Sequence, residues 1–181
     1  MKARHQSWPR IWLMTDERMS DSLWSTIDRL PGTDAGIVFR HYSHPPEARE
    51  ELAQRVADIA RRRGLTLAIA GDTDLATRLD ADLVHNPIEL PCPLPFSRSV
   101  HSIEEAETAR ADGAALVFVS PVHPTSSHPG RKALGKPLAL KIAKAAGVPA
   151  IALGGMNAPR FAGFRRDGFY GWAGIDAWIR R

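Results

Sequence analysis

Val148–Asn157, VPAIALGGMN, joins a short apolar run to a pair of glycines. The run Val148–Leu153 is apolar throughout and does not alternate with polar residues, which predicts a strand buried on both faces. Gly154 and Gly155 leave bare backbone where this strand ends, so their N–H groups can close around an anion. Near the end of an α/β chain, a turn of this kind predicts a phosphate site.

Apolar runs alternate with amphipathic runs along the whole chain. The apolar runs predict eight strands: Ile11–Thr15, Gly36–Arg40, Leu65–Ala70, Leu83–His85, Phe96–Val100, Ala115–Ser120, Val148–Leu153 and Tyr170–Ala173. The amphipathic runs predict six helices: Ser22–Leu30, Pro46–Arg63, Thr73–Asp80, Ile103–Asp112, Pro137–Ala146 and Ala158–Arg166. Strict alternation indicates parallel strands joined by right-handed crossovers. Eight units favour an α/β fold of the closed (β/α)8 TIM-barrel type, and an open doubly wound sheet is the competing fold.

Two segments make the predicted barrel shorter than usual. Residues 86–95, NPIELPCPLP, contain four prolines, which cannot continue a helix. This composition predicts a degenerate fourth crossover in the form of an extended loop. After the last predicted strand only Asp176–Arg181 are left for a helix, which predicts a truncated last helix. The 181 residues are expected to form one domain over residues 1–181, although an ordinary barrel has about 250 residues.

The composition, with 44% hydrophobic and 24% charged residues, is typical of an ordinary globular protein. No apolar run approaches the roughly 18 residues that cross a bilayer, and no apolar segment follows the basic start, so neither a membrane span nor a signal peptide is expected. The only cysteine, Cys92, excludes an internal disulfide and a multi-cysteine zinc site. These features predict a cytoplasmic protein.

The formal net charge of +4 raises the question of nucleic-acid binding. The arginines are scattered along predicted helix faces without interleaved aromatic residues: Arg49, Arg55, Arg61, Arg62 and Arg63. This pattern favours solvated helix surfaces over a nucleic-acid interface. The positive charge suits anionic small substrates better, so phosphorylated small molecules are the expected partners.

Polar residues gather just after the predicted strands, where the active sites of (β/α)8 barrels lie. Asp72 opens a predicted helix, so it is either an N-cap or a magnesium ligand. The loop after the sixth strand combines hydroxyl groups with cations: Thr125, Ser126, Ser127, His128, Arg131 and Lys132. Such a loop suits a pyrophosphate, but its composition is equally typical of a solvated loop. His123 and His128 are candidates for acid–base catalysis near neutral pH.

Two stretches, RSVHSIEEAETARADGAALVFVSPVHPTSSHPG (residues 98–130) and VPAIALGGM (residues 148–156), are similar to the thiamine phosphate synthase family. The similarity spans nearly the whole chain, with looser matches at LMTDER and ADLVH, and includes the thiazole tautomerase branch. The resemblance implies a (β/α)8 barrel. In this family the synthase joins a pyrimidine diphosphate to thiazole phosphate with Mg²⁺ and releases pyrophosphate. The tautomerase isomerises the precursor of thiazole phosphate by proton transfer.

The half of the family's site that handles the pyrimidine diphosphate and its metal is matched only in part. The resemblance implies catalytic roles for Arg40 and Ser99, and a magnesium-binding role for Asp72. Leu90 stands where the family has a second magnesium aspartate, with Glu89 adjacent. Losing one carboxylate ligand weakens a magnesium site unless another residue takes its place.

The half that handles the monophosphate is better preserved. The resemblance implies that six residues bind substrate through hydroxyl groups or backbone N–H groups: Thr125, Ser127, Gly154, Gly155, Ala173 and Gly174. His128 stands where the family has a lysine. Pro121 aligns with the catalytic histidine of the tautomerase, and His123 follows two residues later.

Three functions stay open at this point. The first is a thiamine phosphate synthase that uses Mg²⁺. The second is a metal-free thiazole phosphate isomerase in which His101, His123 or His128 transfers the proton. The third is a non-catalytic protein that binds thiazole phosphate or thiamine phosphate on a degenerate site. Any of the three is compatible with a homo-oligomer.

Overall fold

The computed structural model describes residues 7–125, 130 and 132–179. Eight strands follow one another in the order β1 to β8 and form a closed barrel. This topology confirms the predicted (β/α)8 fold and excludes the open doubly wound sheet. The chain is divided into two compact units, the first ending at Pro95 and the second beginning at Phe96. A single domain over residues 1–181 stays a prediction.

The first unit contains strands β1–β4, which pair in parallel. Their bounds are Ile11–Met14 (β1), Ala35–Phe39 (β2), Thr66–Ala70 (β3) and Leu83–His85 (β4). In the register of these pairs, Leu13 lies opposite Ile37, and Ile69 lies opposite Val84. Every residue of β2, β3 and β4 is buried, as expected for parallel strands that are covered on both faces.

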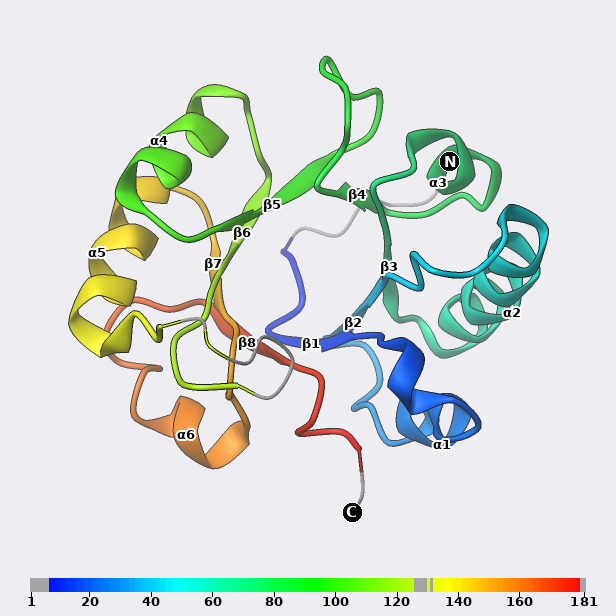
Figure 1. The fold of residues 1–181 in the computed structure, drawn as a ribbon, viewed down its shortest axis with the longest axis horizontal. Helices are drawn as coiled ribbons and strands as arrows, with labels where there is room; N and C mark the ends of the chain where they lie inside the picture. The colour runs from blue at the N-terminus through cyan, green and yellow to red at the C-terminus, as the bar shows by residue number, and fades with distance from the viewer. Residues whose placement is uncertain (1–6, 126–129, 131, 180–181) are drawn as a thin grey trace. The chain divides into compact units, whose positions relative to one another are not determined.

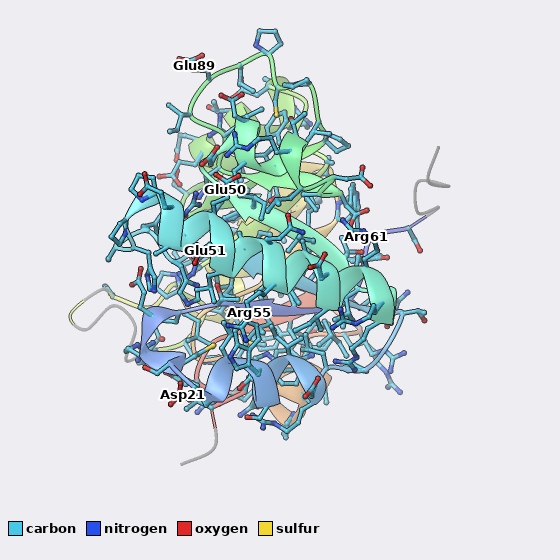
Figure 2. The ribbon with its side chains drawn as sticks, turned by 90° about the vertical axis from the view of Figure 1, so that its right-hand side faces the viewer. Asp21, Glu50, Glu51, Arg55, Arg61 and Glu89 are labelled. Atoms are coloured by element: carbon cyan, nitrogen blue, oxygen red, sulfur yellow. The ribbon has the colours of Figure 1, made fainter. Side chains whose placement is uncertain are left out.

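Four helical segments connect these strands: η1 (Glu17–Met19), α1 (Ser22–Asp28), α2 (Pro46–Arg63) and α3 (Thr73–Arg78). Helix α2 has its predicted bounds, because Pro46 suits the first turn and Gly64 adopts the left-handed conformation (φ 66°) that ends a helix. Helix α2 packs against β2 and β3. Figure 2 shows Glu51, Arg55 and Arg61, all exposed, along its outer side.

The second unit contains strands β5–β8, which also pair in parallel. Their bounds are Phe96–Val100 (β5), Leu116–Val119 (β6), Ala150–Ala152 (β7) and Gly171–Gly174 (β8). The helices are α4 (Ile103–Ala111), α5 (Gly135–Ala146) and α6 (Ala158–Ala162). Helices α4 and α5 pack against each other, and α6 lies against β8 (Figure 1). This arrangement places the turn after β7 next to α6.

The fourth crossover is degenerate, as predicted, whereas the described residues after β8 do not form the truncated last helix that was predicted. No helix forms in residues 86–95 between β4 and β5, and none follows β8 in the described residues up to 179. Helix α6 is shorter than predicted, because Gly163 ends it and the chain continues in turns towards Arg166. No helix in the described part of the chain is both long enough and apolar enough to span a membrane.

Candidate functional site

A cavity of about 390 Å³ in the second unit lies where β7 and β8 end. Its lining includes residues of the loop after β6, the glycine turn, helix α6 and the end of β8: Thr125, Gly154, Gly155, Asn157, Arg160 and Gly174. Four of these residues, Thr125, Gly154, Gly155 and Gly174, are among the six predicted to bind substrate. The fold therefore gathers most of the described residues in that set around one cavity.

The glycine turn requires glycine at both positions. Gly154 and Gly155 have φ values of +93° and +60°, which L side chains rarely adopt. A β-carbon on Gly154 would lie 2.7 Å from Cα of Pro121, so the two backbones approach each other closely. Backbone N–H groups of Val122 and His123 donate to the carbonyl groups of Leu153 and Gly154, at 2.8 and 3.1 Å, and fix the turn.

The N–H groups of the glycine turn remain available for a ligand. Neither the Gly154 N–H nor the Gly155 N–H has an acceptor among the described residues. Successive N–H groups in left-handed or turn conformations form a concave site for an anion, because both carry partial positive charge. The cavity can therefore accept an anionic oxygen at the end of β7.

Arg160 adds a cation to this cavity. The side chain of Asn157 caps helix α6 by accepting a hydrogen bond of 2.9 Å from the Arg160 backbone N–H. The Arg160 guanidinium donates to the carbonyl oxygen of Gly155, which holds it beside the glycine turn. Sequence reasoning missed Arg160, and its place three residues after a helix-capping Asn157 was the available signal.

His101 and His123, the described candidates for proton transfer, are not in the lining of this cavity. The His123 ring packs edge-on against Phe164, with ring centroids 5.8 Å apart, and its buried Nε2 has no partner among the described residues. Burial, and then the charge of Arg160, lower the pKa of His123. His101 Nδ1 lies 2.6 Å from the carbonyl oxygen of Ser120. Two predicted site residues, Ser127 and His128, lie outside the described residues.

Two further predicted site residues lie on strands of the second unit. Ala173 on β8 is fully buried, next to Gly174 in the cavity lining. Ser99 on β5 is half-buried and lines a separate groove of about 400 Å³ against helix α4. The cavity at the glycine turn is therefore built without the side chains of these two residues.

Arg40 is held firmly at the end of β2. Its Nε donates to the Thr15 carbonyl oxygen at 2.8 Å, its backbone N–H donates to Thr15 Oγ1 at 3.0 Å, and its Nη2 lies 3.0 Å from Asp16 Oδ2. Burial lowers the pKa of Arg40, and the Asp16 carboxylate opposes that shift. These contacts leave a half-buried guanidinium in a fixed orientation.

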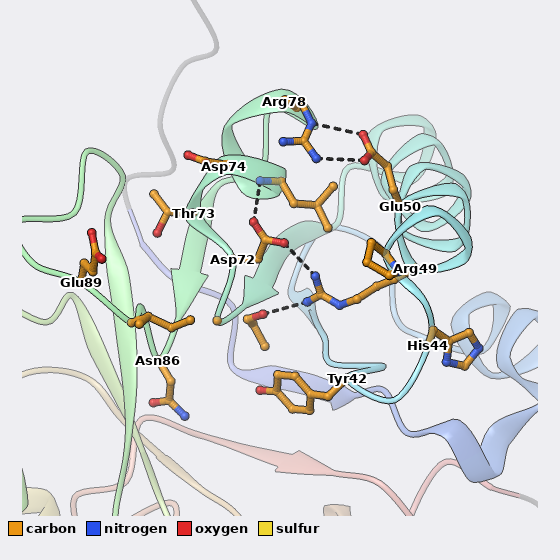
Figure 3. A pocket seen from close by; sticks show the side chains of 15 residues that line it. Tyr42, His44, Arg49, Glu50, Asp72, Thr73, Asp74, Arg78, Asn86 and Glu89 are labelled. Carbon is orange, nitrogen blue, oxygen red and sulfur yellow. Dashed lines mark hydrogen bonds and ion pairs between the residues drawn. The ribbon is translucent and has the colours of Figure 1, made fainter.

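A second cavity, of about 820 Å³, lies at the ends of β2, β3 and β4 in the first unit (Figure 3). Asp72 lines it, and both of its carboxylate oxygens are engaged. Oδ1 accepts a hydrogen bond of 2.8 Å from the Leu75 backbone N–H, which caps helix α3. Oδ2 accepts one of 3.0 Å from Arg49 Nη1, and Arg49 Nη2 donates to the Ala70 carbonyl oxygen at 2.8 Å.

These residues do not fit the magnesium ion that the family resemblance implies. Magnesium prefers oxygen ligands in octahedral geometry, and a guanidinium next to the ligand repels the ion. Asp72 is paired with Arg49, and the described residues contain no group of three histidine, cysteine or carboxylate side chains that could hold a metal. No chemical step is therefore assigned to a metal at Asp72.

The fold and its two polar cavities are those of a (β/α)8 barrel protein with its candidate sites at the carboxyl ends of the strands. The family model described as thiamine monophosphate synthase matches residues 96–178. The thiamine-phosphate synthase of Mycobacterium sp. (strain JLS) is 34% identical over 158 residues, which cover 77% of this chain and 70% of the relative. The chain belongs to the thiamine monophosphate synthase family.

Other relatives extend the match over most of the chain. The putative thiamine-phosphate synthase 2 of Aquifex aeolicus (strain VF5) is 26% identical over 182 residues, which cover 94% of this chain and 98% of the relative. The solved structure of thiamine phosphate pyrophosphorylase from Pyrococcus furiosus superposes with a TM-score of 0.80 at 25% identity. That superposition covers 93% of this chain and 86% of the solved one. Both units are therefore included in the similarity.

Proposed function

We propose that the protein is a thiamine phosphate synthase, an enzyme of thiamine biosynthesis that couples a hydroxymethylpyrimidine diphosphate to thiazole phosphate. Membership of the thiamine monophosphate synthase family supports this reaction class. The observation that carries the proposal is the cavity at the glycine turn. There, the N–H groups of Gly154 and Gly155, which have no acceptor among the described residues, lie beside the guanidinium of Arg160.

In this proposal the cavity of the second unit binds thiazole phosphate. Gly154 and Gly155 donate their N–H groups to the phosphoryl oxygens, and Arg160 supplies the balancing positive charge. Thr125 also lines this cavity. A volume of about 390 Å³ lies within the range of small-molecule sites, which is about 300–1,000 Å³.

The coupling reaction forms one bond and breaks one. The lone pair of the thiazole nitrogen forms a bond to the pyrimidine methylene carbon, and the bond from that carbon to the diphosphate oxygen breaks. The bonding electrons leave with pyrophosphate, and the thiazole becomes a thiazolium cation. No proton moves, so the reaction needs no general base. Holding the thiazole phosphate by its phosphoryl group supplies the orientation that makes the coupling effectively intramolecular.

The alternative function, an isomerase that transfers a proton through a histidine, has less support in the described residues. An isomerase needs a proton-transferring group beside its substrate. His123 packs against Phe164, and His101 Nδ1 is bound to the Ser120 carbonyl group. Neither lines the cavity at the glycine turn. We therefore prefer the synthase over the isomerase.

The proposal is tested by incubating the purified protein with hydroxymethylpyrimidine diphosphate and thiazole phosphate, with MgCl2 and separately with EDTA. Pyrophosphate release and thiamine phosphate formation are measured together, with each substrate omitted in turn as a control. Equal amounts of the two products support the synthase. Thermal stabilisation by thiazole phosphate without either product would instead identify a non-catalytic binding protein, and isomerisation of the thiazole precursor would identify the isomerase.

A further inference from the structure

Arg49 is the most buried cation in the lining of the cavity of the first unit. It lies on α2, its side chain is 11% exposed, and its guanidinium lies over the Phe39 ring at 5.7 Å from the ring centroid. Figure 3 shows it between the Asp72 carboxylate and the carbonyl group at the end of β3. Helix α2 and strand β3 therefore hold one positive charge in a fixed place beside Asp72.

The hydrogen bonds to Asp72 and Ala70 do not use all the N–H groups of the Arg49 guanidinium. An arginine carries five N–H groups, and the hydrogen bonds to Asp72 and Ala70 use two of them. Its Nε is buried and has no acceptor among the described residues. A buried donor without a protein acceptor is costly unless water or a ligand satisfies it. The remaining N–H groups suit the paired oxygens of a phosphate or carboxylate.

The other charges of this cavity lie nearer to solvent. Arg78 and Glu50 form an ion pair of 2.9 Å in which both side chains are about half exposed. Asp74 and Glu89 are exposed residues of the lining. Water screens exposed charges strongly and buried charges weakly, so Arg49 has the strongest electrostatic effect on a ligand. Asp72, already paired with Arg49, cannot offer a free carboxylate to a divalent cation.

We propose that Arg49 binds the anionic group of the ligand in this cavity and takes the place of a divalent cation beside Asp72. The inference rests on the proposed function, in which that anionic group is the diphosphate of the pyrimidine substrate. Arg49 then contacts the oxygens that leave as pyrophosphate and stabilises their charge. Binding of the diphosphate in this chain is therefore independent of Mg²⁺.

Isothermal titration with pyrophosphate tests the inference. The wild type and the variants Arg49→Gln, Arg49→Lys and Arg61→Gln are titrated in EDTA and again in MgCl2. We expect the wild-type dissociation constant to be no higher in EDTA than in MgCl2, because Mg²⁺ complexes free pyrophosphate in solution and the site needs no bound ion. Arg49→Gln raises the dissociation constant about tenfold or more in both buffers, as loss of a charge-assisted contact does. Arg49→Lys keeps part of the affinity. Arg61→Gln, a control from the exposed Arg61–Asp58 ion pair outside the cavity lining, leaves the affinity unchanged.

Three results overturn the inference. The first is wild-type binding that requires MgCl2, and the second is no pyrophosphate binding at all. The third is binding that survives Arg49→Gln but is lost in Gly155→Ala, which places pyrophosphate in the cavity of the second unit. If Arg49→Gln fails to fold, the dissociation constants of the wild type and Arg49→Lys in the two buffers still test the inference. The titration measures pyrophosphate binding without thiazole phosphate. If only the synthase proposal fails, pyrophosphate still binds at Arg49 but no thiamine phosphate forms. If the Arg49 inference fails, the titration itself shows it.

Discussion

A β-carbon on Gly155 would lie 2.6 Å from the carbonyl oxygen of Pro124, closer than real β-carbons come to another atom. Gly155→Ala must therefore shift the turn, and the N–H groups move with it. We expect the variant to bind thiazole phosphate about tenfold more weakly than the wild type, because misplaced donors lose charge-assisted hydrogen bonds. Isothermal titration of the purified variant measures the change.

Gly113→Ala is the matched control for this variant. Gly113 also has a positive φ, +84°, but nothing lies within 4 Å of its would-be β-carbon. The control therefore adds backbone strain without a collision, at about 1 kcal/mol of stability. We expect it to bind thiazole phosphate as the wild type does. Equal losses of affinity in the two variants would mean that backbone strain alone, and not the position of the turn, explains the effect.

The ion pair between Arg40 and Asp16 predicts a pH-dependent contribution to stability. Burial raises the pKa of Asp16, but hydrogen bonds from Arg18 and the charges of Arg18 and Arg40 lower it more, so the pKa lies below its ordinary value of 3.8. The stabilisation is therefore complete above pH 3.8 and is lost as the pH falls through the lower, folded-state pKa. Arg40→Met should cost about 1–3 kcal/mol in urea unfolding at pH 7 and less at pH 2.5.

Arg61→Met is the control for Arg40→Met. Arg61 pairs with Asp58 at 3.0 Å, but both side chains are nearly half exposed. Exposed pairs within one helix contribute only about 0.3–0.5 kcal/mol, so this variant should be close to the wild type at both pH values. A cost of Arg40→Met that stayed constant from pH 7 to pH 2.5 would show that the ion pair is not its cause.

His41 predicts a loss of stability in mild acid. It is buried, stacks on Phe39 with ring centroids 4.9 Å apart, and its Nδ1 lies 3.0 Å from Thr15 Oγ1. Burial, and then the charge of His44, lower its pKa from 6.5 to about 4. The unfolded chain therefore binds the proton first, and stability falls as the pH drops from 6.5 to about 4, by about 3 kcal/mol at most.

His41→Asn removes this titration while keeping the backbone conformation. His41 has a φ of +24°, and asparagine tolerates positive φ better than most residues. We expect urea unfolding of the variant to depend less on pH between 6.5 and 4 than that of the wild type. If the free energies of unfolding of the two proteins changed with pH in the same way, His41 would not be the cause of the stability loss in mild acid.

Asp72 predicts a structural cost that is separate from ligand binding. Its Oδ1 caps α3 through the Leu75 N–H, and its Oδ2 neutralises Arg49. Asp72→Ala should lower the free energy of unfolding by about 1–3 kcal/mol, because it removes the cap and leaves a largely buried cation unpaired. Asp72→Ser retains a capping oxygen and should recover part of the loss. Identical stabilities for the alanine variant and the wild type would contradict this role.

The sequence predicted the order and type of nearly every element, because buried parallel strands are apolar throughout and helix ends carry local signals. The bounds of α2 followed from Pro46 and Gly64, and the missing fourth helix followed from the prolines of residues 86–95. Helix α6 was predicted too long, since the amphipathic pattern continues past Gly163, where the helix ends. Local sequence patterns therefore predicted which elements form more accurately than they predicted where a helix ends.

The site was less predictable, because its contacts join residues far apart in the chain. Arg49 was interpreted as one of several solvated arginines on helix faces, since nothing in its spacing distinguishes it from Arg55 or Arg61. Only the fold brings Asp72 and the end of β3 to its guanidinium. A cytoplasmic location, a homo-oligomer and the roles of Ser127 and His128 stay predictions.

A crystal structure of the protein with thiazole phosphate tests the central claim most directly, namely that the turn at Gly154 and Gly155 binds a phosphoryl group. We predict phosphoryl oxygens within about 2.7–3.2 Å of both glycine nitrogens, with the Arg160 guanidinium in contact with the same group. Phosphate bound at another place in the barrel, or glycine N–H groups occupied by main-chain carbonyl groups in the complex, would contradict the account.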